Sequence, residues 1–358
     1  MNKRIPAAVL AALLCISCAP ALSGCNASVD YELKTDDSGK KYYVAKCSGY
    51  SAGLDGEYEI HEYYGEGENR APVTEIASGG FSVTGLTKIT VPKTVTKIGV
   101  AAFSNNNYLR EVVFAEGINL EVIERGTFGE CLSLQTIEIP SSVKTIEKYA
   151  FYDCSKLESI SLPSVEVIGS NAFYGCTKLA EVNLSESLTT IGEMSFCNTG
   201  LTGIIIPDSV HDIKLPDLDE SGAQKRDEEG NLLYTTTYGI GFGAFLNCNL
   251  LKLAVVGKGV QTITSGAFSE CSSLETVYLP ASLIEIQGAY FSDSAKKYIY
   301  GHAFYKAPLK DLFFEGTEQQ WEELKKHIDN KEAYQNGKTS DNSALFNANL
   351  IFNKTYTK

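Results

Sequence analysis

The sequence predicts a mostly-β solenoid of about nine stacked rungs, each rung being one copy of a repeat. A Phe that follows a small residue recurs nine times, at Phe81, Phe103, Phe128, Phe151, Phe173, Phe196, Phe245, Phe268 and Phe304. Neighbouring Phe residues are 22 to 25 positions apart, except for gaps of 49 and 36 positions. Apolar residues two positions apart follow each Phe, which is the pattern of a strand with one buried face. A unit of this length cannot bury its apolar residues alone, so neighbouring units must stack into a continuous core.

Composition narrows the function classes before any motif is considered. The 358 residues include 31 Lys and Arg and 44 Asp and Glu, a formal net charge of -13, and 44% are hydrophobic. Normal apolar content excludes a largely disordered chain. An acidic chain repels phosphate backbones, so nucleic acid is not an expected partner.

The N-terminus has the pattern of an export signal, predicted over residues 1–24. Lys3 and Arg4 precede an apolar stretch, Ile5 to Ala21, that is too short and wrongly flanked for a stable membrane span. Leu22-Ser23-Gly24-Cys25 then resembles the bacterial lipobox, which implies that the Cys25 thiol carries lipid. Ordinary cleavage after Ala21 is the alternative. The lipobox predicts an exported, membrane-anchored lipoprotein at the bacterial cell envelope or surface.

Each repeat has a fixed internal order. A Leu lies five or six positions after the Phe, apolar residues follow this Leu at +3 and +5, and Pro often ends the segment. The segment from Ala150 to Ile168 shows this unit nearly whole. It resembles the BspA-like leucine-rich repeat (the LRR_5 type) of bacterial surface proteins, over about residues 72–315. The resemblance implies a right-handed leucine-rich-repeat solenoid and links the chain to adhesion.

Two flanking segments resemble the caps of that family. Residues 25–71 would form a tether and an N-terminal β-hairpin cap, and residues 316–358 a C-terminal cap helix and tail. Thr317 and Gln320 have the spacing of a capping box. Trp321, Leu324 and Ile328 follow at helical spacing, so one face of this helix can cover the last rung.

The cysteines follow the repeat. Five of them stand three positions after a repeat Phe: Cys131, Cys154, Cys176, Cys248 and Cys271. Free Cys behaves as a small buried apolar residue, so these are expected to form a structural ladder inside the turns. Disulfides between neighbouring rungs are the alternative in an exported protein.

Sites for chemistry are sparse in the sequence. The four His residues have no metal-ligand spacing, and neither a nucleophile elbow nor a phosphate loop occurs. We therefore expect neither an enzyme nor a cofactor or metal site. One weak calcium-loop candidate consists of Asp217, Asp219, Ser221 and Glu228, at positions 1, 3, 5 and 12 of such a loop. An acidic hairpin insertion explains the same residues without a metal.

The outward-facing residue four positions after each repeat Leu changes in polarity along the array. It is mostly polar or small in the first five rungs and then becomes Ile205, Val255, Tyr278 and Phe313. An exposed apolar stripe usually marks a covered or contacted surface. Two insertions, at about 208–240 and 288–301, lie in this half of the array. Either they fold over the stripe, or they surround a binding face with aromatic residues such as Tyr234 and Tyr238.

Function is expected to be binding. The resemblance implies a non-catalytic, lipid-anchored cell-surface protein that mediates protein–protein adhesion through the sheet face and insertion loops. A glycan-capturing lipoprotein and a purely structural envelope component are the alternatives, because fold alone does not determine function.

Overall fold

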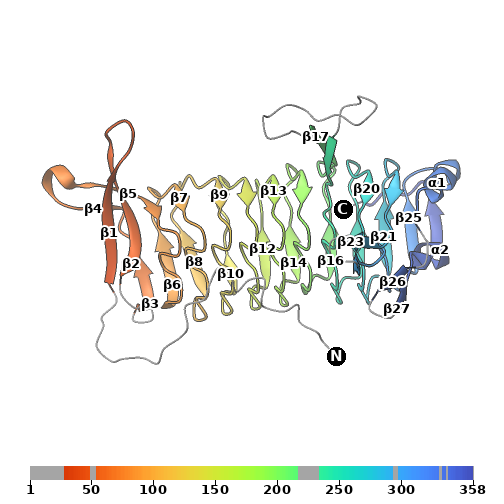
Figure 1. The fold of residues 1–358 in the computed structure, drawn as a ribbon, viewed down its shortest axis with the longest axis horizontal. Coiled ribbons are helices and arrows are strands. Elements are labelled where there is room, and N and C mark those ends of the chain that lie inside the picture. The colour runs from red at the N-terminus through yellow and green to blue at the C-terminus, as the bar shows by residue number, and fades with distance from the viewer. Residues whose placement is uncertain are drawn as a thin grey trace.

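The protein folds as one elongated solenoid of stacked rungs, shown in Figure 1. This computed structural model describes residues 28–48, 54–216, 234–292, 297–329, 333–335 and 338–357. The predicted signal segment 1–24 and Cys25 lie outside the described residues. The prediction of a mostly-β repeat solenoid is confirmed, since nearly all elements are short strands and neighbouring rungs pair in parallel.

The first side of the solenoid, here called the strand face, receives one parallel strand from each rung. Within each of three groups of neighbouring rungs, a strand pairs in parallel with the equivalent strand of the next rung, as Ala254 does with Val277, and Val277 with Leu312. Residues three and five positions after the repeat Leu point inward, and all but Phe114, Val182 and Leu184 are buried, whereas most residues between them face outward. The strands, in order, are β3 (Asp55–Glu59), β6 (Gly85–Val91), β8 (Glu111–Phe114), β10 (Thr136–Ile137), β12 (Ser159–Ser161), β14 (Glu181–Asn183), β16 (Gly203–Ile205), β19 (Leu253–Val255), β21 (Thr276–Leu279), β25 (Asp311–Phe314) and β28 (Asn349–Phe352).

A second side consists mainly of two-residue strands that end in a buried apolar residue. Most of them pair in parallel with the equivalent strand of a neighbouring rung. Isolated bridges from Ile191 to Ile240 and from Ile286 to Ile328 continue the row. The strands are β5 (Ala71–Ile76), β7 (Lys97–Ile98), β9 (Val122–Ile123), β11 (Thr145–Ile146), β13 (Val167–Ile168), β15 (Thr190–Ile191), β20 (Thr262–Ile263) and β22 (Glu285–Ile286).

The third side is a stack of turns around the repeat Phe. All nine Phe side chains are fully buried, and neighbouring ring centroids lie 5.1 to 5.7 Å apart. The backbone links the turns along the long axis, as when Phe151 N donates to Ala172 O (2.7 Å) and Phe173 N to Ser195 O (2.7 Å). The residue two positions after each Phe has a positive φ, from Val83 (56°) to Lys306 (62°). This left-handed residue reverses the chain direction without a helix.

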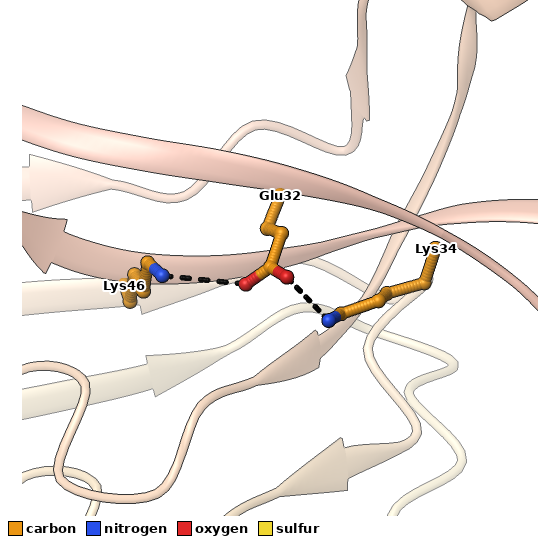
Figure 2. Close-up of polar contacts among 3 residues, drawn as sticks. All are labelled: Glu32, Lys34 and Lys46. Atoms are coloured by element: carbon orange, nitrogen blue, oxygen red, sulfur yellow. Dashed lines mark hydrogen bonds and ion pairs between the residues drawn. The ribbon is translucent and has the colours of Figure 1, made fainter.

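An antiparallel hairpin forms the N-terminal end. Strand β1 (Ser28–Thr35) pairs with β2 (Lys41–Ser48), which pairs in parallel with β5. On this hairpin Glu32 lies between Lys34 and Lys46 and bonds both, as Figure 2 shows. These bonds, the one from Lys34 first, hold the pKa of Glu32 below its usual value. Strand β4 (Tyr63–Tyr64) and the short 3₁₀ helix η3 (Gly67–Asn69) complete this end.

Two helices and a small hairpin form the other end. Helix α1 (Glu318–Lys325) begins with the predicted capping box of Thr317 and Gln320. Its buried Trp321 packs against Phe314, with ring centroids 5.4 Å apart, and Leu324 is buried beside it. Helix α2 (Ser343–Asn347) leads into β28, and β26 (Ala333–Gln335) pairs with β27 (Lys338–Ser340).

Both insertions contain an antiparallel hairpin. Strand β17 (Ile213–Pro216) pairs with β18 (Tyr234–Thr237), and β17 stands out from one long side of the solenoid in Figure 1. Strand β23 (Tyr290–Ser292) pairs with β24 (Lys297–Tyr300). Among the described residues, none of the helices has the length and apolar character needed to cross a membrane.

Candidate binding groove on the strand face

A groove of about 610 Å³ crosses the strand face in the C-terminal half of the array. It runs over β14, β16, β19 and β21 and ends at the tail residues Lys354, Thr355 and Tyr356. We call it the strand-face groove. The groove lies where the outward-facing residues turn apolar, so it is the candidate functional site.

Gly203 creates a depression in the floor of the groove. It lies two positions after the repeat Leu and faces outward on β16, between Glu181 on β14 and Leu253 on β19. A Cβ atom added to Gly203 would meet nothing closer than the carbonyl oxygen of Leu253, at 3.9 Å. Ile205, two positions further along the same strand, is 37% exposed beside this depression. The floor therefore offers apolar surface with room for a side chain from outside.

Aromatic rings form the wall at the far end. The ring of Tyr278 stacks on that of Phe313, with centroids 4.4 Å apart and an interplanar angle of 10°. Tyr356 meets Tyr278 edge to face, with centroids 5.3 Å apart. The tail reaches this place because Asn353 N bonds Gly316 O (3.2 Å) and Lys354 N bonds Phe314 O (3.4 Å).

Charged side chains surround the apolar floor. Four carboxylates line the groove, those of Glu181, Glu186, Asp208 and Glu315, against two amines, those of Lys258 and Lys354. Lys258 pairs with Glu315 at 3.1 Å, and this hydrogen bond raises the pKa of Lys258. Asp208 Oδ1 accepts a hydrogen bond from the backbone N–H of Lys258 (2.8 Å). The lining thus carries a net negative charge beside an apolar surface.

The structure brings together four of the six residues predicted for the binding face. Ile205, Val255 and Tyr278 line the groove, and Phe313 packs against Tyr278. Val255 faces outward as predicted, but only 9% of it is exposed. Sequence reasoning missed the tail residues Lys354 and Tyr356. The apolar strand at 349–352 was the available signal, because it places the following residues next to β25.

The two remaining residues, Tyr234 and Tyr238, lie elsewhere. Tyr234 is paired with Pro216 at the start of β18. The hydroxyl of Tyr238 accepts a hydrogen bond from Gln287 Nε2 (3.3 Å), and its ring packs edge-on against Phe242. Among the described residues of the insertions at about 208–240 and 288–301, only Asp208 lines the groove. Residues 217–233 and 293–296 lie outside the described residues, so the covering or surrounding role of the insertions stays a prediction.

The five Cys residues of the predicted ladder are buried and free. Each Sγ lies 3.1 Å from the carbonyl oxygen of the Phe one rung earlier, as in Cys176 to Phe151 and Cys271 to Phe245. Asn106 occupies the same place one rung before Cys131, and its Nδ2 bonds Phe81 O (2.7 Å). The position thus supplies a donor to a carbonyl group inside the turn.

Metal binding can be examined only in the part of the chain that the structure describes. No group of three or more His, Cys, Asp or Glu residues there is arranged to hold a metal ion. The calcium-loop candidate of Asp217, Asp219, Ser221 and Glu228 lies outside the described residues.

Comparisons with known proteins identify the repeat. The profile described as "BspA type Leucine rich repeat region" matches six copies over residues 74–164, 118–216 and 233–323. The search of curated proteins gave no match.

Three solved structures illustrate the likeness in fold. A leucine rich cell surface protein from Faecalibacterium prausnitzii is 22% identical, with 86% of this chain and 98% of that chain covered and a TM-score of 0.45. The pneumococcal vaccine antigen PcpA is 16% identical, covers 93% and 98%, and has a TM-score of 0.40. The T. pallidum leucine rich repeat protein is 20% identical, covers 69% and 78%, and has a TM-score of 0.32. From the profile match and the stacked repeats, this chain belongs to the BspA type leucine-rich repeat family.

Proposed function

We propose that the chain is a non-catalytic, lipid-anchored protein of the bacterial surface that binds protein partners through the strand-face groove. One observation carries the proposal: an apolar depression at Gly203 and Ile205 opens on a strand face that is mostly polar in the earlier rungs. Exposed apolar surface with a polar margin is typical of protein–protein contact sites. Family membership is consistent with binding or adhesion and leaves the partner open.

Protein is favoured over glycan as the partner. A sugar ring needs an aromatic face on which to stack. One face of Tyr278 is covered by Phe313, and Tyr356 packs against the same residue at an interplanar angle of 75°. The depression around Gly203 instead suits a protruding apolar side chain.

A groove-filling substitution tests this proposal. Gly203→Phe places a ring in the depression, and its Cβ would meet nothing closer than 3.9 Å. Ser159→Phe is the matched control, because Ser159 holds the same outward +2 position on β12, outside the groove. The full-length chain would be tested for binding to immobilised fibronectin, laminin and collagen and to a glycan array. We expect binding to at least one protein that Gly203→Phe abolishes and Ser159→Phe retains. Binding to glycans alone, no binding, or binding unchanged by Gly203→Phe would refute the proposal.

The lipid anchor is tested separately. Cells that express the chain would be fed an alkyne-tagged palmitate, and the chain would be isolated and examined for label. We expect label on the natural chain and none on Cys25→Ser, which would also leave the membrane fraction. Label that persists on Cys25→Ser would show that the lipid is attached elsewhere, and a natural chain without label would refute the anchor.

A further inference from the structure

The tail of the chain shows what chemistry the strand-face groove accepts. Lys354, Thr355 and Tyr356 line one end of the groove. They present a cation, a backbone segment and an aromatic ring, and this ring meets Tyr278. A segment of extended chain that carries a basic and an aromatic residue is therefore already placed against this surface.

Charge favours a cationic occupant. Besides the pair of Lys258 and Glu315, the lining carries the carboxylates of Glu181, Glu186 and Asp208 and the amine of Lys354. If the tail moves away, Lys354 leaves and the negative charge of the groove increases. An incoming basic side chain would replace this cation, whereas an acidic one would be repelled.

The tail is held loosely enough to be displaced. Its backbone bonds to Gly316 O and Phe314 O are 3.2 and 3.4 Å long, the first at the long end of the usual range and the second beyond it. In the described residues, no backbone–backbone hydrogen bond follows that of Lys354. Tyr356 then contacts the wall through one edge-to-face ring contact. A ligand that supplies its own aromatic ring can replace this contact.

We propose that the strand-face groove binds an extended peptide segment with a basic residue close to an aromatic or large apolar one, and that this segment displaces the tail residues 354–357. The proposal rests on the proposed function and adds the class of partner to it. The basic group lies near Glu181 and Asp208, while the apolar group enters the depression at Gly203. The occupant is a peptide segment of another protein.

Synthetic peptides test the inference. A fluorescein-labelled 12-residue peptide that alternates Lys, Tyr and Ser would be titrated into the full-length chain. Its two controls replace every Lys by Glu or every Tyr by Ser. We expect the Lys/Tyr peptide to bind at least about 10-fold more tightly than either control. Raising the salt concentration should weaken binding, since charges contribute to it.

Variants of the chain distinguish specific peptide binding in the groove from non-specific binding. They also distinguish failure of this inference from failure of the proposed function. Gly203→Phe should abolish peptide binding and Ser159→Phe should not. Tyr356→Ala should tighten binding by about 3- to 10-fold, because the tail then competes less. Equal binding of all peptides, or no effect of Tyr356→Ala, would overturn the inference. Matrix-protein binding that still depends on Gly203 would in that case leave the proposed function intact.

Self-association is the remaining outcome. Analytical ultracentrifugation would show whether the chain forms oligomers that Gly203→Phe dissolves. Such oligomers would identify a second copy as the occupant and would overturn the inference, whereas a monomer at all concentrations would support it.

Discussion

The Sγ of Cys154 donates a hydrogen bond to the carbonyl oxygen of Phe128, one rung earlier, across 3.1 Å. The same relation links Cys131 to Phe103 and Cys248 to Phe196. The thiol is a second donor to a buried carbonyl oxygen, because Phe128 O also accepts a hydrogen bond from the backbone N–H of Cys131 (3.2 Å). Together with burial, this geometry supports the ladder role proposed for these cysteines.

Thiol reactivity follows from that burial. Burial raises the pKa of Cys131 to about 12 and that of Cys154 well above its ordinary value. Only the thiolate reacts with alkylating agents. We expect Cys131 and Cys154 to stay unmodified by iodoacetamide at pH 8 in the folded chain and to react fully in guanidinium, as peptide mass spectrometry would show. Alkylation of Cys154 in the folded chain at the rate of a free thiol would contradict this.

The Phe stack is expected to control stability. The Phe173 ring lies 5.2 Å from that of Phe151 and 5.1 Å from that of Phe196. Phe173→Ala should lower the free energy of unfolding by about 3–5 kcal/mol, and Phe173→Leu by about 1.5 kcal/mol or less. Denaturant titration would measure both, with the exposed Lys178→Ala as the control, expected to change it by less than about 0.5 kcal/mol. If Phe173→Ala and Lys178→Ala changed the free energy of unfolding equally, the Phe stack would not be a main source of stability.

Backbone strain should be removable at Val83. This β-branched residue has a φ of 56° and is 47% exposed, so its side chain contributes little to the core. Val83→Asn should stabilise the chain by about 1 kcal/mol, because Asn tolerates the left-handed region better. Asn105 occupies the equivalent position in the next rung with a φ of 60°, so Asn105→Val should destabilise by a similar amount. Thermal unfolding measures both, and a lower melting temperature for Val83→Asn would contradict the argument.

Stability should fall at alkaline pH. Desolvation raises the pKa of Tyr152 to about 12, and desolvation together with the hydrogen bond to Glu193 raises that of Tyr300 further. A raised pKa in the folded state contributes stability that is complete below about pH 10 and declines as pH rises through the folded pKa. We expect melting temperatures measured from pH 8 to 12 to fall above about pH 10. Tyr300→Phe should flatten that fall, while Tyr108→Phe, at a 64% exposed site, should leave it unchanged. A fall of the same size in Tyr300→Phe would show that other groups cause it.

Periodic features were predictable from the sequence, and contacts between distant segments were not. The recurring Phe, the apolar pairs of the strands and the capping box of Thr317 depend on local spacing, which the sequence displays directly. The position of the tail on the strand face depends on pairing between β25 and β28, 38 positions apart. Local pattern predicts that β28 is a strand but not where the residues after it lie.

Tyr300 is a second example of a contact between distant segments that local sequence pattern does not predict. Its hydroxyl donates to Glu193, 107 positions earlier. Its side chain lies over Gly243 and Gly266, where an added Cβ would come within 3.0 and 3.3 Å of ring atoms. Glycine at this place is no signal of the cover, because both glycines have a positive φ and Gly126 holds the same place in another rung with only Ala101 Cβ near, at 3.9 Å. The hairpin of β23 and β24 can be positioned only by packing.

The hydrogen bonds between successive Phe turns run along the long axis of the solenoid, and this direction determines how the chain responds to pulling. A force between the two ends would act on each rung-to-rung layer almost in line with its bonds, so that the layers separate one after another instead of sharing the load. One released rung of about 23 residues would add roughly 80 Å of contour length. A protein built in this way would yield in small steps at modest force, and it would lengthen under shear while the rungs that have not separated keep their surface intact.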